Sequence, residues 1–202
     1  MRQVKVMGFD LDGTLVKTKL DFRAIRKDLG IPEGDTLKYI SSMPEPQRKL
    51  MLSELEGKEK EAAVKAELSP GARDVLELCQ DLGIKVVVIT RNSQEAAALT
   101  LKVLGIEVDM IITRESAAPK PSPDAINLVL NYYRIEPYQM AFVGDYLYDI
   151  QAGNHAGVKT ILLTTQERAD EWMSSADLVA EDLFEVCDLI RSAREVVPDA
   201  GE

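Results

Sequence analysis

Short apolar runs separated by helical patterns constrain the fold of this chain more than any other feature. Each run is rich in Val, Ile or Leu and is apolar on both faces, which is typical of a strand buried in a parallel sheet. The runs cover residues 4–9, 85–89, 108–112, 140–143 and 160–163. Strands that alternate with helices in this way predict an α/β fold with a doubly wound parallel sheet.

Helix boundaries between these runs are marked by proline and glycine. Serine-proline pairs at 69–70 and 122–123 predict helix starts, with Ser as the capping residue and Pro in the first turn. Glycines that follow the apolar repeats are expected to end helices, namely Gly83, Gly105 and Gly157. A final helix is expected over about residues 182–194.

The segment 17–68 breaks the alternation, because it contains no strand-like run and reads as helices. Its stripes at helical spacing are Phe22, Ile25 and Leu29, and then Leu52, Leu55, Glu59, Ala62 and Ala66. We therefore expect a small helical cap domain over residues 17–68, inserted after the first strand. Residues 1–16 and 69–202 would then form the α/β core domain.

Composition narrows the range of partners. The formal net charge of -10 repels nucleic acid and anionic membranes, so neither is expected as a partner, and a phosphorylated substrate would need local cations or a metal. No apolar run is long enough to cross a membrane, and the first residues do not form a signal-peptide pattern. Cys79 and Cys187 have neither metal-ligand nor redox spacing, so buried thiols and a cytoplasmic location are expected. Disorder is expected only within residues 198–202.

Asp10 and Asp12 come directly after the first apolar run. Ligands of open α/β sheets bind outside the carboxyl ends of the strands, so both carboxylates are expected at the binding edge. They would repel each other there unless a cation or a proton intervened. The alternative is a plain strand-to-turn junction, because Asp12-Gly13 is a common turn pair, but a turn does not explain Asp10 after a fully apolar strand.

Further segments bring polar side chains to the same edge. They are Thr90, Arg91 and Asn92 after the second run, Lys120 between two prolines, and Asp145 and Asp149 after the fourth run. Each has an ordinary alternative, because a strand-end Thr or Asn can cap a helix and a Lys or Arg can lie on the surface, the interpretation favoured for Arg91. Taken together, they supply the nucleophile, metal site and positive charge that phosphoryl transfer requires.

The order of these motifs resembles that of the haloacid dehalogenase-like superfamily. The matching features are Asp-x-Asp-Gly-Thr at 10–14, a strand-ending Thr, a proline-flanked Lys and Gly-Asp-x-x-x-Asp at 144–149. The helical insert is similar to the cap of the phosphoglycolate phosphatase-like branch. The resemblance implies a phosphatase that acts on a small phosphorylated metabolite through an aspartyl phosphate, with Mg²⁺ as cofactor.

The resemblance also implies a role for each residue. Asp10 attacks phosphorus, and Asp12 protonates the leaving oxygen and then activates water. The substrate-binding residues would be Thr90, Arg91, Asn92 and Lys120, of which Thr90 and Lys120 are also catalytic. The metal residues would be Asp10, Asp12 through its backbone carbonyl, Asp145 and Asp149, the last one directly or through a water.

Two other functions stay open at this point. A sugar phosphomutase would return the phosphate to a bound sugar, and a phosphate-binding module would keep the fold without turnover. The presence of Asp10, Asp12, Lys120 and Asp145 argues against the module. The short, polar insert favours hydrolysis over transfer to a sugar. Asp12 also argues against carbon–halogen displacement, because true dehalogenases lack an acid at this position.

Overall fold

The computed structural model describes residues 1, 3–17 and 20–195, so the predicted disordered tail at 198–202 lies outside the described residues. At its centre is a six-stranded sheet with the strand order β5-β4-β1-β6-β7-β8 and parallel pairing throughout. The strands are β1 (Val6–Phe9), β4 (Lys85–Ile89), β5 (Met110–Ile112), β6 (Met140–Gly144), β7 (Lys159–Leu163) and β8 (Leu178–Ala180). The predicted doubly wound α/β fold is therefore confirmed.

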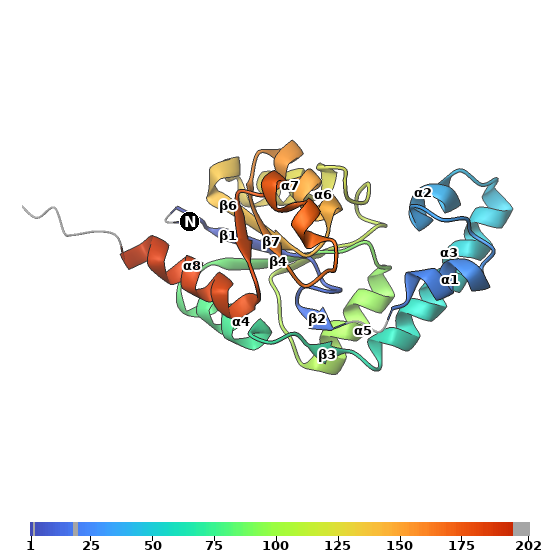
Figure 1. The fold of residues 1–202 in the computed structure, drawn as a ribbon, viewed down its shortest axis with the longest axis horizontal. Coiled ribbons are helices and arrows are strands. Elements are labelled where there is room, and N and C mark those ends of the chain that lie inside the picture. Colours follow the sequence, from blue (N-terminus) through green and yellow to red (C-terminus); the bar gives the residue numbers. More distant parts are fainter. Residues whose placement is uncertain (2, 18–19, 196–202) are drawn as a thin grey trace, which may run out of the picture.

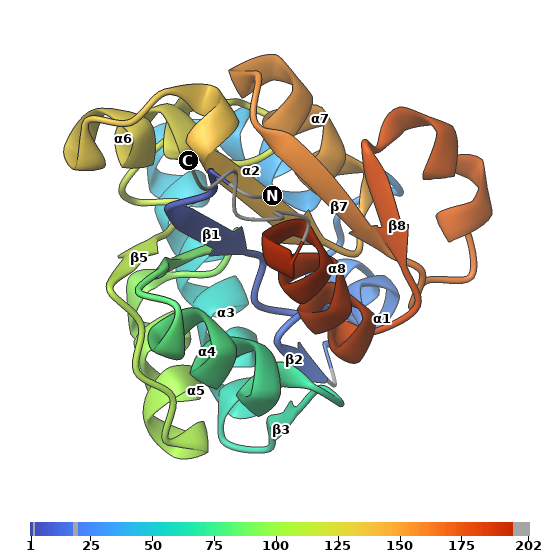
Figure 2. The same cartoon turned by 90° about the vertical axis from the view of Figure 1, so that its left-hand side faces the viewer.

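Helices cover both faces of this sheet (Figure 2). One face carries α6 (Asp124–Tyr133) and α7 (Leu147–Ala156), and the other carries α4 (Ala72–Asp81), α5 (Gln94–Leu104) and α8 (Leu183–Glu195). Successive β1 side chains alternate between the two apolar clusters, since Val6 packs with the α6 layer and Met7 with the α4 layer. Among the described residues, no helix is both long enough and apolar enough to cross a membrane.

Glycine ends the helices as predicted. Gly105 and Gly157 cap the carboxyl ends of α5 and α7 in the left-handed conformation, with φ of 61° and 72°. The starts of two helices differ from the expected positions. α6 begins at Asp124, whose backbone N–H donates to Ser122 Oγ at 3.3 Å, so Ser122 acts as a cap one residue earlier than a regular N-cap.

The start of α4 is set by contact with another helix. It begins at Ala72 after Gly71, which has φ of 77°, rather than directly after Ser69. A Cβ atom on Gly71 would lie 2.7 Å from the backbone nitrogen of Phe184 in α8. Only glycine fits this approach, and the helix therefore starts later than the serine-proline pair suggested.

Strand β8 was not predicted from the sequence. It is three residues long and lies at the edge of the sheet, where Val179 is 40% exposed, so it has neither the length nor the two-sided burial of the other strands. Single 3₁₀ turns surround these late strands: η1 (Pro137–Gln139), η2 (Ala169–Glu171) and η3 (Met173–Ser175).

Both cysteines are buried in the α4–α8 layer, as expected. Burial raises the pKa of the Cys79 thiol to about 12 and also raises the pKa of Cys187. Thiolate is the reactive form of cysteine, so neither side chain is suited to redox chemistry or metal binding.

Three helices lie together beyond the carboxyl ends of the strands (Figure 1). They are α1 (Phe22–Asp28), α2 (Thr36–Ser41) and α3 (Glu45–Ala63). They bury a small apolar cluster of their own around Ile25, Ile31, Ile40 and Leu55. Phe22, expected on the buried stripe, is instead 43% exposed, because it faces the cavity described below. We call α1–α3 the cap.

A short antiparallel ribbon joins the cap to the core. It pairs β2 (Val16–Lys17) with β3 (Glu67–Leu68), so the expectation that residues 17–68 contain no strand is wrong at both ends of that segment. Two-residue strands carry no readable periodicity, which explains the miss. The predicted domain boundaries, at 16/17 and 68/69, fall at this ribbon and stay a prediction.

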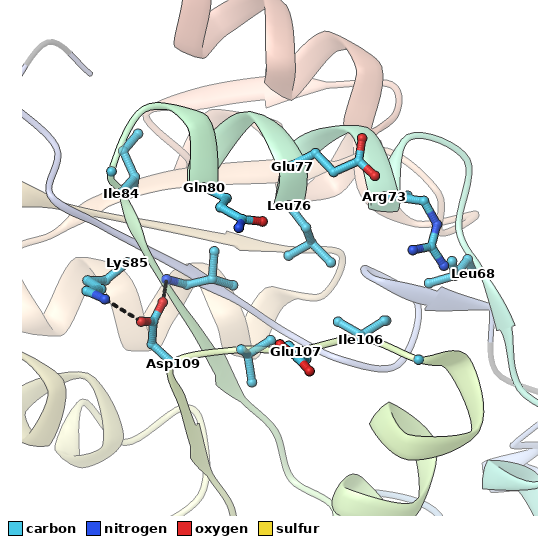
Figure 3. Close-up of a pocket in the computed structure, with 14 residues that line it drawn as sticks. Leu68, Arg73, Leu76, Glu77, Gln80, Ile84, Lys85, Ile106, Glu107 and Asp109 are labelled. Carbon is cyan, nitrogen blue, oxygen red and sulfur yellow. Dashed lines mark hydrogen bonds and ion pairs between the residues drawn. The ribbon is translucent and has the colours of Figure 1, made fainter.

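A second cleft, of about 570 Å³, lies beside α4 and is lined in part by the start of β4 and the segment before β5 (Figure 3). Lys85, the first residue of β4, donates to Asp109 Oδ1 at 2.6 Å, and the other oxygen of Asp109 accepts from the Val86 N–H at 2.8 Å. This carboxylate therefore ties the segment before β5 to the start of β4. The predicted site residues all lie elsewhere, at the carboxyl ends of the strands.

Candidate active site

The predicted site residues meet where the strand order reverses. β1 pairs with β4 on one side and with β6 on the other, so the residues that follow these strands are brought together. Asp10 follows β1, Thr90 follows β4 and Asp145 follows β6. The junction between β1 and β6 is the topological switch point, where open α/β sheets bind their ligands.

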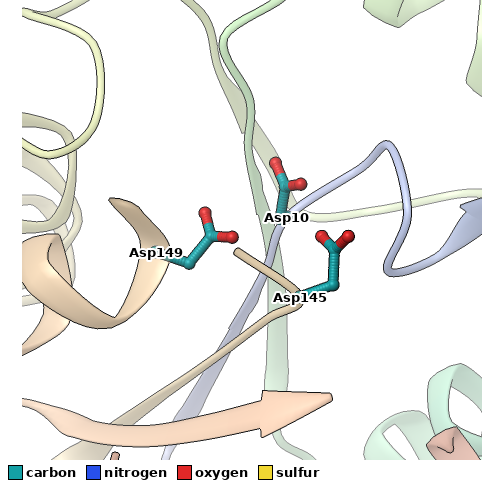
Figure 4. A group of neighbouring side chains, drawn as sticks. All are labelled: Asp10, Asp145 and Asp149. Carbon is teal, nitrogen blue, oxygen red and sulfur yellow. The ribbon is translucent and has the colours of Figure 1, made fainter. Parts of the chain in front are cut away.

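Three carboxylates converge at this point (Figure 4). Asp10, Asp145 and Asp149 each offer an oxygen, and these oxygens lie within 4.8 Å of one another. Burial raises the pKa of Asp10 well above its usual range, and burial together with the Asp149 charge raises the pKa of Asp145 to about 6. The cluster therefore favours a proton or a cation among its oxygens.

Lys120 is buried beside two of these carboxylates. Its Nζ donates to Asp10 Oδ1 at 2.5 Å and to the carbonyl oxygen of Ile89 at 2.8 Å, and it lies 2.6 Å from Asp149 Oδ1. Burial alone would lower the pKa of Lys120, but Asp10 and Asp149 outweigh it and raise the pKa. The side chain is therefore a fixed positive charge, and the alternative of an ordinary surface lysine is wrong.

Neutral donors orient Asp145. Thr14 Oγ1 donates to its Oδ1 at 3.2 Å, and Gln166 Nε2 donates to its Oδ2. Gly13, with φ of 89°, lies so close that a Cβ there would collide with the Asp145 carboxylate. Sequence reasoning missed Thr14 and Gln166 as partners of Asp145. The Asp-Gly-Thr motif contained a signal for Thr14, whereas Gln166, in the segment after β7, carried none.

Asp149 is held differently from Asp145. Its Oδ2 accepts from the Tyr146 N–H at 3.0 Å, and its Oδ1 lies beside Lys120. A Cβ on Gly144 would collide with the Asp149 side chain, so glycine is needed at the end of β6. Because cationic and N–H donors already surround Asp149, its position suits an outer role better than a direct bond to a metal.

The donor set fits a hard divalent cation. Carboxylate oxygens are the ligands that Mg²⁺ prefers, and Asp10 and Asp145 each contribute one to the cluster. A cation at this position would balance charges that burial makes costly. We therefore assign Asp10 and Asp145 as the residues that could hold such an ion, with Asp149 beside them.

Asp12 contacts the loop after β4. Its Oδ2 accepts from Asn92 Nδ2 at 2.5 Å. Thr90 Oγ1 accepts from the Asn92 N–H at 3.1 Å, and both side chains are buried. The helix-cap alternative for Thr90 and Asn92 is wrong, because Ser93 is the N-cap of α5. The hydroxyl hydrogen of Thr90 can still be donated to a ligand.

Arg91 does not lie on an open surface, so the favoured interpretation is wrong. Its Nη2 donates to Asp35 Oδ1 of the cap at 2.5 Å, and its guanidinium lies 4.9 Å from the centroid of the Tyr148 ring. Asp35 also caps α2 by accepting from the Lys38 N–H. Arg91 therefore links the loop after β4 to the cap at the mouth of the site.

A cavity of about 970 Å³ separates the strand ends from the cap. All the predicted site residues line it: Asp10, Asp12, Thr90, Arg91, Asn92, Lys120, Asp145 and Asp149. The cap contributes basic and apolar groups to the same cavity, among them Phe22, Arg23 and Arg26. A cavity of this volume suits a small molecule whose anionic end reaches Lys120.

Comparison with known proteins identifies the family. Residues 19–163 match the family model of the haloacid dehalogenase-like hydrolases. The chain belongs to this family. The sequence is 29% identical to the uncharacterized hydrolase YOR131C of Saccharomyces cerevisiae over 95% of this chain and 93% of that protein. It is 27% identical to the phosphoglycolate phosphatase of Chromobacterium violaceum over 95% of this chain and 99% of that protein.

Solved structures agree with the fold of this hydrolase. A phosphonoacetaldehyde hydrolase-like protein from Oleispira antarctica superimposes with a TM-score of 0.79 at 16% identity, covering 95% of this chain and 93% of that one. At this identity the likeness concerns the fold alone. The resemblance to the superfamily and to its phosphoglycolate phosphatase-like branch is thus confirmed.

Proposed function

We propose that this hydrolase is a magnesium-dependent phosphatase that cleaves a small phosphomonoester through a phosphate covalently bound to Asp10. The observation that carries the proposal is the contact between Asp10 and the buried cation Lys120, beside Asp145 in the cavity between the strand ends and the cap. A carboxylate is a weak nucleophile toward an anion unless positive charge neutralises the approach. Membership of a hydrolase family supports the same reaction.

The first step would be attack of an Asp10 oxygen on phosphorus, which breaks the bond from phosphorus to the ester oxygen. Asp12 would give its proton to that oxygen as it leaves. Lys120, Thr90 and Asn92 would surround the transferred phosphoryl group with donors. Magnesium held by Asp10 and Asp145 would supply further positive charge to the phosphate oxygens.

The second step would be hydrolysis of the phosphate bound to Asp10, which would regenerate the free enzyme. Asp12, now ionised, would take a proton from a water molecule whose oxygen attacks phosphorus. The bond between phosphorus and Asp10 would break, inorganic phosphate would leave, and Asp12 would again carry its proton. The hydrogen bond from Asn92 Nδ2 to Asp12 Oδ2 supports this role, because it orients the carboxyl toward the same cavity.

Small phosphoesters, including phosphoglycolate, are the substrates we propose to test first. The relatives named phosphoglycolate phosphatase support this choice, and the volume of the cavity supports a small metabolite over a macromolecule. Two buried free thiols support a cytoplasmic location. A sugar phosphomutase is the competing proposal, because its first step needs the same residues.

The deciding experiment measures inorganic phosphate released from a panel of small phosphoesters, with Mg²⁺ and with excess chelator. We expect turnover only with the metal, and intact mass of acid-quenched protein should show an added phosphoryl group on wild type and none on Asp10→Asn. Asp188→Asn is the matched control, because Asp188 is an exposed carboxylate on α8 that pairs with Arg191. Wild-type turnover by Asp10→Asn, or full activity in chelator, would refute the proposal. Phosphate that moves between positions of a sugar faster than it is released would favour the mutase.

A further inference from the structure

Glu59 is a buried acid on a cap helix. It lies on α3, which packs against core helix α5, and only 3% of its surface is exposed. Its neighbours on the same stripe are mainly apolar, so a carboxylate there must be paired within the protein. Both of its oxygens accept hydrogen bonds from the core rather than from the cap.

The partners of Glu59 belong to the loop after β4 and to the segment after β5. Its Oε1 accepts from Arg114 Nη1 at 2.5 Å, and its Oε2 accepts from the Ser93 N–H at 3.1 Å. Ser93 is the N-cap of α5, so this carboxylate also lies at the positive end of a helix. A cap residue thereby occupies the amino terminus of a core helix.

Arg114, the partner of Glu59, also binds the backbone of the loop after β4. The same Nη1 donates to the carbonyl oxygen of Arg91 at 3.2 Å, and the Arg114 N–H donates to the carbonyl oxygen of Asn92 at 3.3 Å. The Arg114 side chain is 7% exposed. Three consecutive residues of the loop, Arg91 to Ser93, thus have a backbone polar group held by Glu59 or Arg114.

This loop carries groups that the proposed reaction uses. Thr90 begins it, and Asn92 holds the carboxyl of Asp12. A shift of the loop backbone would move both side chains relative to phosphorus. Misplacement by about 1 Å can cost on the order of 10²-fold in rate. The hydrogen bonds that fix this backbone should therefore affect the rate of the proposed reaction.

We propose that Glu59, acting through Arg114 and through the Ser93 N–H, is a positioning residue that makes the geometry of the loop after β4 (residues 90–93) depend on docking of cap helix α3. The inference rests on the proposed function, because it assigns Glu59 to the same reaction. With α3 in place, the loop presents Thr90 and Asn92 in their working positions. With α3 displaced, Arg114 loses its buried partner and the loop backbone loses its anchor, so the site is completed only when the cap is closed.

A second contact between the cap and α5 provides a matched control. Lys60 follows Glu59 in sequence and forms an ion pair with Glu95 of α5, whose side chain is 72% exposed. This pair joins the same two helices at the surface and does not touch the loop. Glu95→Gln therefore tests the effect of losing a cap–core ion pair without disturbing residues 90–93.

The test compares Glu59→Gln with Glu95→Gln by two measurements. The first is hydrogen exchange of a peptide that spans residues 90–94, which reports the Ser93 amide without any substrate and does not contain residue 95. The second is the pair of kcat and KM, together with inhibition by inorganic phosphate. We expect Glu59→Gln to exchange faster in this peptide, to lose about 10- to 100-fold in kcat/KM mainly through kcat, and to bind phosphate more weakly. Glu95→Gln should stay within about twofold of wild type, as expected for an exposed pair.

A double variant without the buried charges separates loss of the positioning contact from misfolding caused by an unpaired buried Arg114. Glu59→Gln with Arg114→Gln leaves no unpaired buried charge, and it should fold while showing the same losses. Unchanged exchange in the Glu59 variants, or faster exchange with kcat/KM within twofold of wild type, would overturn the positioning role. If the wild type hydrolyses no phosphoester, the proposed function fails, whereas the exchange comparison still decides whether the cap controls the loop.

Discussion

Lys120 Nζ lies 2.5 Å from Asp10 Oδ1 while both side chains are almost fully enclosed by protein. The same Nζ lies 2.6 Å from Asp149 Oδ1, so one ammonium group contacts two of the three clustered carboxylates. The nucleophile proposed for the reaction therefore has a positive charge beside it. A carboxylate that must approach a phosphate dianion needs this compensation.

Replacement of Lys120 by Met is expected to abolish most activity. Loss of a single stabilising group at such a site costs about 10²–10³-fold in kcat, and loss of a full charge should be at the upper end. The variant should also be less stable at pH 7 in chelator, because Asp10 and Asp149 lose their common cation. Turnover and thermal unfolding with and without Mg²⁺ measure both effects. Lys85→Met removes an exposed lysine–aspartate pair at the far edge of the sheet, and its kcat should match that of wild type.

The stability of the metal-free protein should depend on pH through Asp145. Burial and the charge of Asp149 raise the pKa of Asp145 from 3.8 to about 6. The folded state then binds a proton more tightly than the unfolded chain does, so the stabilising contribution is complete below about 3.8 and is lost as the pH rises through about 6.

Measuring the thermal unfolding temperature in chelator between about pH 4 and pH 7 tests this dependence, because that range brackets the pKa of about 6. Asp145→Asn resembles the protonated side chain and should lose that part of the slope, and excess Mg²⁺ should remove it from the wild type. Identical pH profiles for wild type and Asp145→Asn in chelator would contradict the assignment.

Asp12→Asn is expected to slow poor leaving groups far more than activated ones. General acid catalysis is worth about 10²–10⁴-fold, but an aryl phosphate with an acidic leaving group needs little of it. The comparison requires kcat/KM for an alkyl and an aryl phosphate, with hydrolysis of the phosphoenzyme measured separately. Equal slowing of both substrates, when that later hydrolysis is not rate-limiting, would remove the acid role.

Asp35→Asn isolates the link between Arg91 and the cap. Asparagine caps a helix as well as aspartate does, so α2 should stay intact while the charge pair is lost. A partly exposed pair contributes up to about 1 kcal/mol, which corresponds to a rise in KM of about fivefold and a weaker salt dependence of KM. Asp21→Asn is the matched control, since Asp21 caps α1 and lines the same cavity. A similar KM change in both variants would show that Arg91 is not the cause.

Sequence reasoning succeeded where strand order alone positions a side chain. Asp10, Thr90 and Asp145 each follow a two-sided apolar strand, and a parallel sheet brings the ends of neighbouring strands together regardless of detail. Lys120 was harder, because a loop residue has no periodicity, and only its flanking prolines and the motif order pointed to it. Its contacts with Asp10 and Asp149 needed the structure.

Contacts across the cap could not be derived in this way. Glu59 stood on a helical stripe in the sequence, but nothing there indicated that its partners would be Arg114 and Ser93. Gln166 likewise reaches Asp145 from the segment after β7 only because of how that chain segment returns over the sheet. Partners of this kind depend on how two packed units meet, which local patterns do not encode.

The β2–β3 ribbon means that the chain enters and leaves the cap through adjacent points. A segment attached in this way can be lengthened, shortened or exchanged without moving any strand of the central sheet. If the proposed reaction takes place at the strand ends, such a change would leave the residues proposed for catalysis in place and would alter only the cap side of the cavity. Divergence of substrate range in such a protein can proceed by remodelling one module, provided each new module still presents an acid where Glu59 meets the core.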